Sequence, residues 1–372
     1  MNTTKTNPHN DRVKRDYLIW LCEAKQRSVA TVEQARHAID RLEIYTGFKD
    51  FGSFNKEQAL GFKHALQATK AQRSEKQISI ATVKAVLQAV REFLGWLQGQ
   101  QDYRRRITTA DIAYLNLTTG EERQAQVTTP KRSASLEQYR TALFAMPIET
   151  ELQRRDRALM AMLLVTCMRD AAVVSLKVKH LDIEQRHVFQ DPRQVNTKFR
   201  KTINTFFFPV GDDIAAIVVD WWRYLTAEKS FARDDPLFPK TLNGHDQHMN
   251  FAPVGLSREH WADAAPVRKI FKTAFERVGL PYVHPHSIRD TLTKFAYSLN
   301  LSPEQLKAWS QNMGHDHVLT TLNCYGQVTV ERQSELIRQI AAASVAANPP
   351  DDMAQDIAER VHALLRKDAS SI

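Results

Sequence analysis

The chain is poor in the residues that break helices. Its 372 residues include 12 glycines and 14 prolines, and apolar residues recur at helical spacing along much of the chain. It also lacks an apolar run long enough to span a bilayer, and its polar N-terminus does not read as a signal peptide. We therefore expect a mainly α-helical protein that is soluble and intracellular, in a bacterial cytoplasm.

Cysteine is scarce as well. The three cysteines, Cys22, Cys167 and Cys324, are far apart, odd in number and without metal-ligand spacing. This pattern excludes a disulfide framework and a cysteine metal site, and it favours reduced thiols.

Positive charge is abundant but unevenly distributed. The chain carries a net charge of +9, and residues 1–134 hold 22 lysines and arginines against 14 aspartates and glutamates, a net charge of +8. A basic first third favours a module that grips a polyanion such as nucleic acid. A solubilising surface is the alternative, which charge alone does not exclude.

The hydrophobic pattern divides the chain into segments. We expect a disordered N-terminus over 1–10, a small four-helix module over 11–117, a linker over 118–134, a second domain over 135–345, and a tail over 346–372 with a short amphipathic helix at 352–366. Capping-box matches, which mark helix starts, occur at Thr31–Gln34, Ser135–Gln138 and Ser302–Gln305. Residues 187–189 and 203–210 read as strands joined by a polar turn, and 234–262 as an irregular surface excursion.

Five residues in the second domain carry the chemical signal. His286 and Arg289 are three apart, His315 follows Gly314, and Tyr325 comes ten residues later, whereas Arg169 lies far upstream. Cleaving a phosphodiester requires neutralised oxygens, a nucleophile and a proton for the leaving oxygen. Two arginines, two histidines and a tyrosine supply a phosphate clamp, proton carriers and a nucleophile.

A lysine on the turn between the two strands would protonate the leaving 5′ oxygen. Lys198 is the first candidate and Lys201 the second. Other basic residues are candidates for binding DNA: Lys84, Arg91, Arg104, Arg105, Arg106, Lys131 and Arg132, with Lys201 again. Each of these is equally compatible with a solvated face.

These motifs resemble those of the tyrosine recombinase (phage integrase) family. Thr-Cys-Met-Arg169 is similar to the first arginine box of that family, and His286-Ser-Ile-Arg289, Met-Gly-His315 and Asn-Cys-Tyr325 are similar to the second. Asn-Thr-Lys198 is similar to the hairpin lysine. The resemblance spans about residues 10–345, and its specific part is 286–325.

The resemblance implies both a fold and an activity. It implies a helical, SAM-like core-binding domain and a tyrosine-recombinase catalytic domain, which together form a C-shaped clamp around double-stranded DNA. Tyr325 would form a 3′-phosphotyrosyl bond, and two strand exchanges would pass through a Holliday junction without metal or other cofactor. A homotetramer would act at specific sites, the C-terminal segment would dock onto a neighbour, and accessory proteins would bend the DNA or set direction. We expect an integrase of a mobile element, associated with the bacterial nucleoid.

The sequence departs from the family pattern at two points. The third position after Arg169, often acidic, is Ala172, with Asp170 nearby. The interval from His315 to Tyr325 is one residue longer than the commonest pattern. One extra helical residue turns a side chain by about 100°, so the helix of the nucleophile must begin or bend differently.

Three other functions compete with this interpretation. A type IB topoisomerase uses the same chemistry on one strand, but the short N-terminal helical module favours a recombinase. A DNA-binding regulator without catalysis would not need the complete set of cleavage groups. A zinc site made from His284, His286, His315 and His317 would leave the arginines unexplained.

Overall fold

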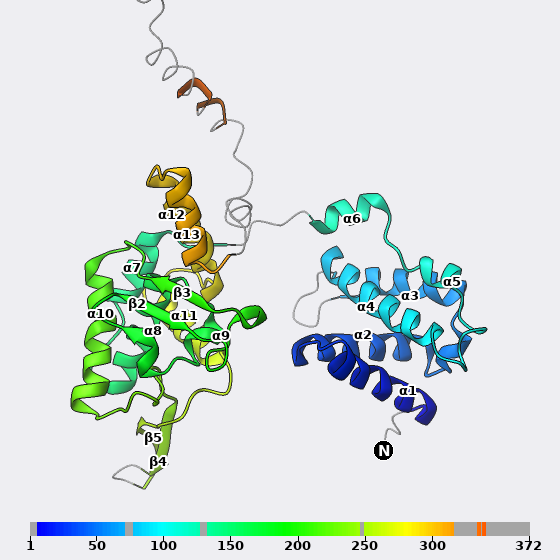
Figure 1. The fold of residues 1–372 in the computed structure, drawn as a ribbon, viewed down its shortest axis with the longest axis horizontal. Helices are drawn as coiled ribbons and strands as arrows, with labels where there is room; N and C mark the ends of the chain where they lie inside the picture. The colour runs from blue at the N-terminus through cyan, green and yellow to red at the C-terminus, as the bar shows by residue number, and fades with distance from the viewer. Residues whose placement is uncertain are drawn as a thin grey trace, which may run out of the picture. The chain divides into compact units, whose positions relative to one another are not determined.

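The computed structural model describes residues 6–70, 77–126, 132–245, 249–315, 333–335 and 337–339. The chain divides into two compact units, Met1–Thr129 and Pro130–Ile372. Helices dominate the described part of each unit, and the antiparallel sheets found there lie in the second (Figure 1). The predicted fold class, mainly α with a small antiparallel sheet, is confirmed. No described helix is long and apolar enough to cross a membrane.

The first unit is a bundle of four longer helices with two short ones. The long helices are α1 (Pro8–Ile19, extended by a π-helical turn, Trp20–Ala24), α2 (Val29–Thr46), α3 (Lys56–Ala68) and α4 (Ile80–Gln98), and the short ones are α5 (Thr109–Ala113) and α6 (Thr119–Gln126). Their apolar faces meet in a core that includes Tyr17, Ile39, Phe62, Leu87 and Phe93. The four-helix module predicted from the sequence is therefore present.

Two helices of this unit begin earlier than predicted. α1 starts at Pro8, inside the stretch expected to be disordered, because Asn7 accepts hydrogen bonds from the N–H groups of His9 and Asn10. The buried Asn10 side chain then donates to the Lys49 carbonyl. α2 is capped by Ser28, which accepts from the N–H of Thr31, so the predicted capping box at Thr31 does not form.

Part of the predicted linker is also helical. Residues 119–126 form α6, which packs on α4, and Gln67 of α3 donates to Glu121. Thr118 caps this helix, because its hydroxyl accepts from the Glu121 N–H and its own N–H donates to the Glu121 carboxylate. The loss of apolar periodicity misled the sequence analysis, since polar contacts hold this helix. The rest of the predicted linker falls largely outside the described residues.

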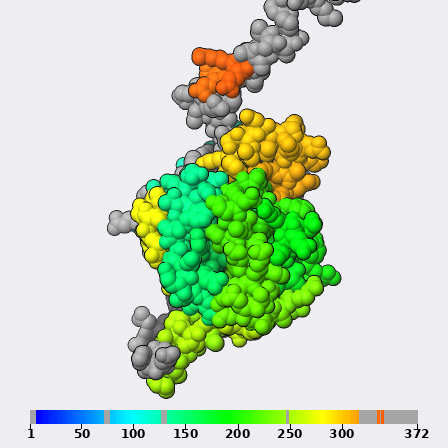
Figure 2. Space-filling model, turned by 90° about the vertical axis from the view of Figure 1, so that its left-hand side faces the viewer, coloured from blue at the N-terminus to red at the C-terminus, as the bar shows by residue number. Residues whose placement is uncertain are grey.

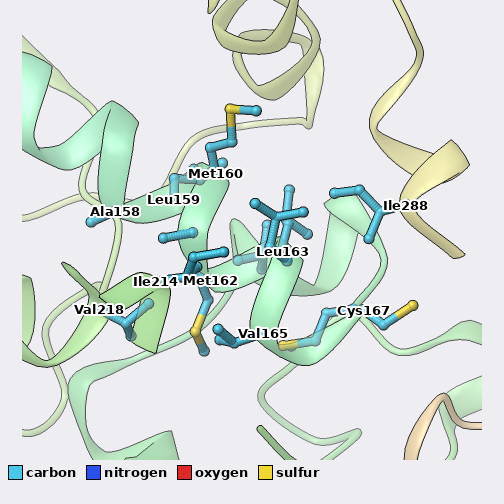
Figure 3. Close-up of a cluster of buried hydrophobic side chains, with 14 of the residues drawn as sticks. Ala158, Leu159, Met160, Met162, Leu163, Val165, Cys167, Ile214, Val218 and Ile288 are labelled. Carbon is cyan, nitrogen blue, oxygen red and sulfur yellow. The ribbon is translucent and has the colours of Figure 1, made fainter. Parts of the chain in front are cut away.

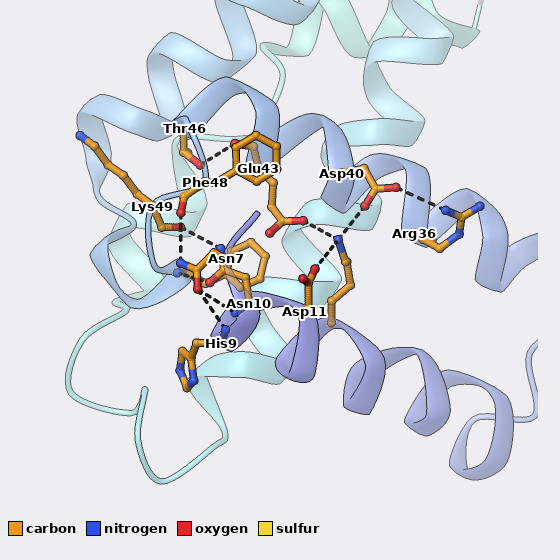
Figure 4. A network of polar contacts seen from close by, with 12 residues as sticks. Asn7, His9, Asn10, Asp11, Arg36, Asp40, Glu43, Thr46, Phe48 and Lys49 are labelled. Atoms are coloured by element: carbon orange, nitrogen blue, oxygen red, sulfur yellow. Dashed lines mark hydrogen bonds and ion pairs between the residues drawn. The ribbon is translucent and has the colours of Figure 1, made fainter. Parts of the chain in front are cut away.

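A polar network ties α1 to α2 (Figure 4). The Lys14 ammonium donates to Asp40 at 2.9 Å and to Glu43, whose side chain is only 2% exposed. Desolvation by burial lowers the pKa of Lys14, but the hydrogen bonds to Glu43 and Asp40 outweigh it and raise that pKa above its usual value. The ammonium is therefore the counter-charge that permits a carboxylate in this position.

The second unit contains the remaining helices. They are α7 (Leu136–Phe144), α8 (Glu151–Thr166), α9 (Asp170–Val173), α10 (Asp212–Arg223), α11 (Ala265–Arg277), α12 (Ile288–Ser298) and α13 (Pro303–Asn312). Capping boxes open α7 at Ser135 and α13 at Ser302, as predicted, and a further one opens α8 at Thr150. Helix α9 is followed by a 3-10 turn, Val178–His180.

Helix α8 is the centre of the second unit. It is buried on every side from Ala158 to Thr166 and packs against α7, α10 and α11. Figure 3 shows its side chains meeting Ile214 and Val218 of α10 and Ile288 of α12. A helix that is apolar all round is stable only inside a core. Its C-terminal end is therefore a fixed point from which the following residues are positioned.

Strands β1 (Leu181–Asp182), β2 (His187–Gln190) and β3 (Ile203–Phe206) form an antiparallel sheet in the order β1-β2-β3. Pairing of Val188 with Thr205 and of Gln190 with Ile203 puts these four side chains on the buried face. The predicted strands are thus present, and the turn between β2 and β3 contains Lys198.

A second hairpin corrects the expectation for 234–262. Strands β4 (Thr241–His245) and β5 (Phe251–Leu256) pair antiparallel and project from the rest of the unit (Figures 1 and 2). Their exposed residues leave little periodic burial to reveal a strand from sequence, because the hairpin has no second layer covering most of it.

We predict that Lys14→Met destabilises the first unit by about 2–4 kcal/mol, because it leaves the buried Glu43 carboxylate without its counter-charge. Chemical denaturation, followed by the fluorescence of Trp20 and Trp96, measures this change. Arg36→Met is the matched control, since Arg36 pairs with exposed Glu33 and its loss should change stability little. Equal effects of the two substitutions would contradict the prediction.

Candidate active site

A small cavity brings together residues from four segments of the second unit. It lies among the end of α8, the β2–β3 turn, α12 and the end of α13. Its lining includes Thr166, Met168, Arg169, Ala172, Gln190, Thr197, Lys198, Ile203, Thr205, Arg289 and Met313. Three residues predicted to act on a phosphate, Arg169, Lys198 and Arg289, therefore meet in one place.

Arg169 is positioned by the way α8 ends. Cys167, the C-cap, adopts a left-handed conformation with φ 55° and ψ 21°, which costs about 1 kcal/mol for a residue other than glycine. The chain then continues in an extended conformation to Arg169. This residue is half-buried and is the N-cap of α9. Because α8 is locked in the core, this turn holds the backbone of Arg169 at the cavity.

Arg289 is buried, with 5% of its surface exposed. Its guanidinium donates from Nη1 to the carbonyl of Cys167 and from Nη2 to the carbonyl of Met313, both at 2.8 Å. These carbonyls cap the C-terminal ends of α8 and α13, where the helix dipoles are negative. The arginine is thus held by two helix ends and still lines the cavity.

The helix that carries Arg289 is itself anchored. Tyr139 donates to Ser287 at 2.8 Å, Ser287 donates to the carbonyl of His284, and Thr291 donates to the carbonyl of Ala134. Burial raises the pKa of the Tyr139 phenol, so it remains a protonated donor. These contacts connect the start of α12 to α7 and leave Arg289 little freedom to shift.

His315 contacts Arg289 because of the turn at Gly314. Gly314 has φ +73°, and the N–H of His315 donates to the carbonyl of Ser310, as expected for a helix ended by a left-handed glycine. The His315 Nε2 lies 2.5 Å from Nη2 of Arg289. A guanidinium can only donate, so this contact requires an unprotonated Nε2 and a hydrogen on Nδ1.

Lys198 and Lys201 line different cavities. The turn between β2 and β3 bends sharply at Phe199 and Arg200, which have φ of 60° and 51°. Lys198 lines the cavity with the two arginines, and its ammonium lies over the Phe199 ring at 4.8 Å from the ring centre. Lys201 lines a neighbouring cavity with His315. This placement favours Lys198 over Lys201 as the lysine that acts together with the two arginines.

Of the two other predicted residues, one lies apart from this cluster and the other is not among the described residues. His286 is exposed in the 3-10 turn Pro285–Ser287 before α12 and is not among the residues that line the cavity. Tyr325, the expected nucleophile, lies outside the described residues, as do His317 and the tail over 346–372. Their predicted roles are therefore still predictions.

The third position after Arg169, which is often acidic in the family, contributes no carboxylate to the cavity lining. Ala172 lines it and is almost fully buried, and Asp170 is not among the lining residues. Asp170 instead accepts from the Ala171 N–H and lies 3.8 Å from Arg268. Three further polar residues line the cavity, Gln190, Thr197 and Thr205, and no motif in the sequence marks them. Only the alternation of β2 and β3 hinted at the inward direction of Gln190 and Thr205.

The residues predicted to bind DNA differ in their exposure and in their contacts with other side chains of the protein. On α4, Lys84 is half-buried and Arg91 exposed, seven residues apart on one face. Arg104 and Arg105 are exposed, whereas Arg106 bonds Asp50 at 2.7 Å and stacks on Tyr103. Arg132 is exposed, and Lys131 lies outside the described residues. Arg106 is therefore the least available of the set.

Two arginines and a lysine converge on one small cavity, and together they supply the donors that an anion with several oxygens would require. The forked donors of arginine match phosphate, and the neighbouring histidine and lysine can move protons. The cavity thus lies in a helical domain that carries a three-stranded sheet.

The catalytic unit matches the model of the phage integrase family over residues 135–332, which is more than half of the chain. The chain belongs to this family, the tyrosine recombinases, and is an enzyme of DNA strand exchange. The family resemblance read from the arginine, histidine and tyrosine motifs is thereby confirmed.

Curated relatives extend the similarity beyond the catalytic unit. The chain is 23% identical to tyrosine recombinase XerC of Shewanella amazonensis over 307 residues, which cover 81% of this chain and 86% of the relative. It is 25% identical to tyrosine recombinase XerC of Shigella flexneri serotype 5b over 328 residues, covering 85% and 91%.

Solved structures share the fold at low sequence identity. A lambda integrase dimer bound to a COC′ core site matches with a TM-score of 0.58 and 12% identity over 86% of this chain and 99% of that one. The XerH recombinase in a post-cleavage complex with a difH substrate matches at 0.57 and 14%, over 87% and 83%. The Tn1549 transposon integrase in complex with transposon right end DNA matches at 0.56 and 14%, over 88% and 99%.

We predict that Arg289→Met lowers the stability of the second unit by about 2–4 kcal/mol, because it leaves the carbonyls of Cys167 and Met313 buried without a donor. Thermal unfolding measures this effect. Arg223→Met on the exposed face of α10 is the control and should change stability by less than about 0.5 kcal/mol. If Arg289→Met were as stable as the control, Arg289 would have no structural role.

Proposed function

We propose that the cavity holds the scissile phosphate of a DNA strand and that the protein is a site-specific integrase of a mobile element. The observation that carries this proposal is the convergence of Arg169, Lys198 and Arg289 on one cavity from distant parts of the chain. The two guanidiniums would neutralise the phosphate oxygens, which otherwise repel a nucleophile.

The reaction follows from the groups present. The Tyr325 hydroxyl oxygen attacks phosphorus, and the bond from phosphorus to the 5′ oxygen breaks. Lys198 delivers a proton to that oxygen, while the tyrosine loses its own to a base. His286 and His315 are the candidates for this base and for hydrogen bonds to the phosphate. The product is a 3′-phosphotyrosyl bond and a free 5′ hydroxyl.

The second half of the reaction reverses the first with a new partner. A 5′ hydroxyl from another strand gives its proton to the now neutral Lys198 and attacks phosphorus. The bond from phosphorus to the tyrosine oxygen breaks, and the protonated base returns its proton to that oxygen. The covalent intermediate conserves the energy of the broken bond, so the exchange needs no ATP. Two such exchanges produce and resolve a Holliday junction.

Two features of the described site support a resting arrangement before DNA binds. The Lys198 ammonium lies over Phe199, which is 75% exposed, and so must leave this ring to reach a leaving oxygen. His315 accepts from Arg289, so its Nε2 carries no proton in this state. We propose that a bound phosphate draws Lys198 from Phe199 by opposite charge.

The wider assembly is part of the same proposal. The structural relatives include DNA complexes, among them a lambda integrase dimer on a core site and a transposon integrase on a transposon end. By analogy, we propose that four copies act on paired sites in double-stranded DNA, with accessory proteins setting direction, in a bacterial cytoplasm. The transposon and phage relatives support a mobile element as the substrate.

We predict that Tyr325→Phe abolishes covalent attachment to DNA while leaving binding within about 3-fold of wild type, because one hydroxyl is lost and the DNA contacts remain. The substrate is a nicked duplex selected from a random library by the wild-type protein. Denaturing electrophoresis with EDTA present reveals the adduct.

The same assay separates the competing functions. A recombinase joins strands of two duplexes through a Holliday junction, whereas a type IB topoisomerase relaxes a single supercoiled circle. A regulator forms no adduct at all, although it binds the selected duplex tightly. An adduct that persists in Tyr325→Phe would assign the nucleophile to another residue.

We predict that Lys84→Gln or Arg91→Gln weakens binding to all duplexes and reduces the slope of log affinity against log salt by about one unit, because each removes one phosphate contact. Fluorescence anisotropy at several salt concentrations measures the slope. Glu92→Gln, adjacent on α4, is the control and should not reduce it. An unchanged slope in either basic variant would assign that residue to a solvated face.

A further inference from the structure

The cavity contains a hydroxyl that makes no hydrogen bond to the described residues. Thr197 lines the cavity beside Lys198, and its Oγ1 is buried with no hydrogen-bond partner in the part of the chain that the structure describes. A buried hydroxyl without a partner loses its bonds to water and gains none in return. A buried hydroxyl without a hydrogen bond is uncommon in native proteins, and a ligand that binds next to it is one explanation.

Local structure gives no reason for this hydroxyl. Thr197 stands at the N-cap of the 3-10 turn Lys198–Arg200, where a threonine oxygen commonly accepts from a following N–H. Here no side-chain capping bond forms, although the Thr197 carbonyl accepts from the N–H of Arg200. The Thr197 backbone therefore takes part in the turn, whereas its hydroxyl makes no hydrogen bond within the described residues.

A second threonine in the same cavity shows the usual situation. Thr205 is 1% exposed, accepts from the Gln190 amide at 3.0 Å and donates to the carbonyl of Asn312 at 3.2 Å. Its hydroxyl thereby joins β3 to β2 and to the end of α13. Two threonines thus line one cavity, one bonded within the protein and the other not.

We propose that Thr197 is a further catalytic residue, whose hydroxyl donates a hydrogen bond to an oxygen of the phosphate held by Arg169 and Arg289. This inference rests on the proposed function of the cavity. A phosphate in the transition state has more lone pairs than two guanidiniums can satisfy, and a fixed hydroxyl needs little reorganisation to reach one. The ligand class is a phosphodiester, or inorganic phosphate as its simplest mimic.

The position of Thr197 next to Lys198 gives the contact a second consequence. The left-handed residues Phe199 and Arg200 fold the turn back, so that both Thr197 and Lys198 line the cavity. A phosphate bound by the hydroxyl would hold this part of the turn close to the leaving oxygen. Thr197 would then both stabilise charge and keep the lysine within reach.

The test compares Thr197→Val, Thr197→Ser and Thr205→Val in the full chain. Valine keeps the branched shape and removes only the hydroxyl, whereas serine retains the hydroxyl. We expect Thr197→Val to be at least as stable as wild type, because it removes an unpartnered hydroxyl. Thr205→Val should be less stable, because it breaks two internal hydrogen bonds.

Two measurements then probe the cavity. The first is the rate of covalent adduct formation on the selected nicked duplex at saturating protein, which we expect Thr197→Val to reduce about 100-fold, the scale seen when one donor to a reacting oxyanion is removed. Thr197→Ser should retain most of the rate. The second is the affinity for inorganic phosphate, from the rise in melting temperature, which Thr197→Val should lower about 10-fold.

Each outcome decides between distinct ideas. If wild type forms no adduct, the proposed function fails, and the phosphate affinity still tests Thr197. If wild type forms an adduct and binds phosphate, but Thr197→Val matches it in both, the role of Thr197 is overturned. A loss that Thr197→Ser does not restore would also overturn it, since it would point to packing.

Discussion

The buried guanidinium of Arg289 is the contact on which the site depends. It joins the carbonyl ends of α8 and α13, at Cys167 and Met313, and it also contacts His315. Helix ends concentrate negative partial charge, so two of them together make a suitable environment for a buried cation. The same arrangement sets the position of Arg169, two residues after Cys167. One residue thus both holds the fold together at the cavity and faces the proposed phosphate.

The part of the cavity lining that comes from the β2–β3 turn is held in a different way from the part that carries the arginines. Arg289 stands on α12, and Arg169 stands in the short connection that follows the buried helix α8, whereas Lys198 stands on a turn between two short strands. That turn is held by backbone bonds and by left-handed Phe199 and Arg200. A rigid clamp with a more adaptable proton donor suits a reaction in which the leaving oxygen must both depart and return. Thr197, whose hydroxyl has no partner among the described residues, lines the same cavity.

Much of the fold was predictable because its helices bury regular stripes and begin at recognisable caps. Ser135 and Ser302 open α7 and α13 as predicted, since a capping box is a local signal. The predictions were wrong where long-range contacts decide. α1 starts at the Asn7 cap, and Asn7 and Asn10 reach the distant carbonyls of Phe48 and Lys49, whereas α6 depends on Glu121 meeting α3. The β4–β5 hairpin has little periodic burial, so its pattern carried no signal.

The sequence by itself determined the family and its chemistry, because the arginine, histidine and tyrosine motifs keep their order and neighbours whatever the packing. Only the tertiary structure decided which of these residues meet. It placed Lys198 rather than Lys201 with Arg169 and Arg289. Within the described residues it bonded the hydroxyl of Thr205 and gave that of Thr197 no partner. The physical reason is that hydrogen-bond partners are assigned by contacts between segments far apart in the chain, which no local pattern records.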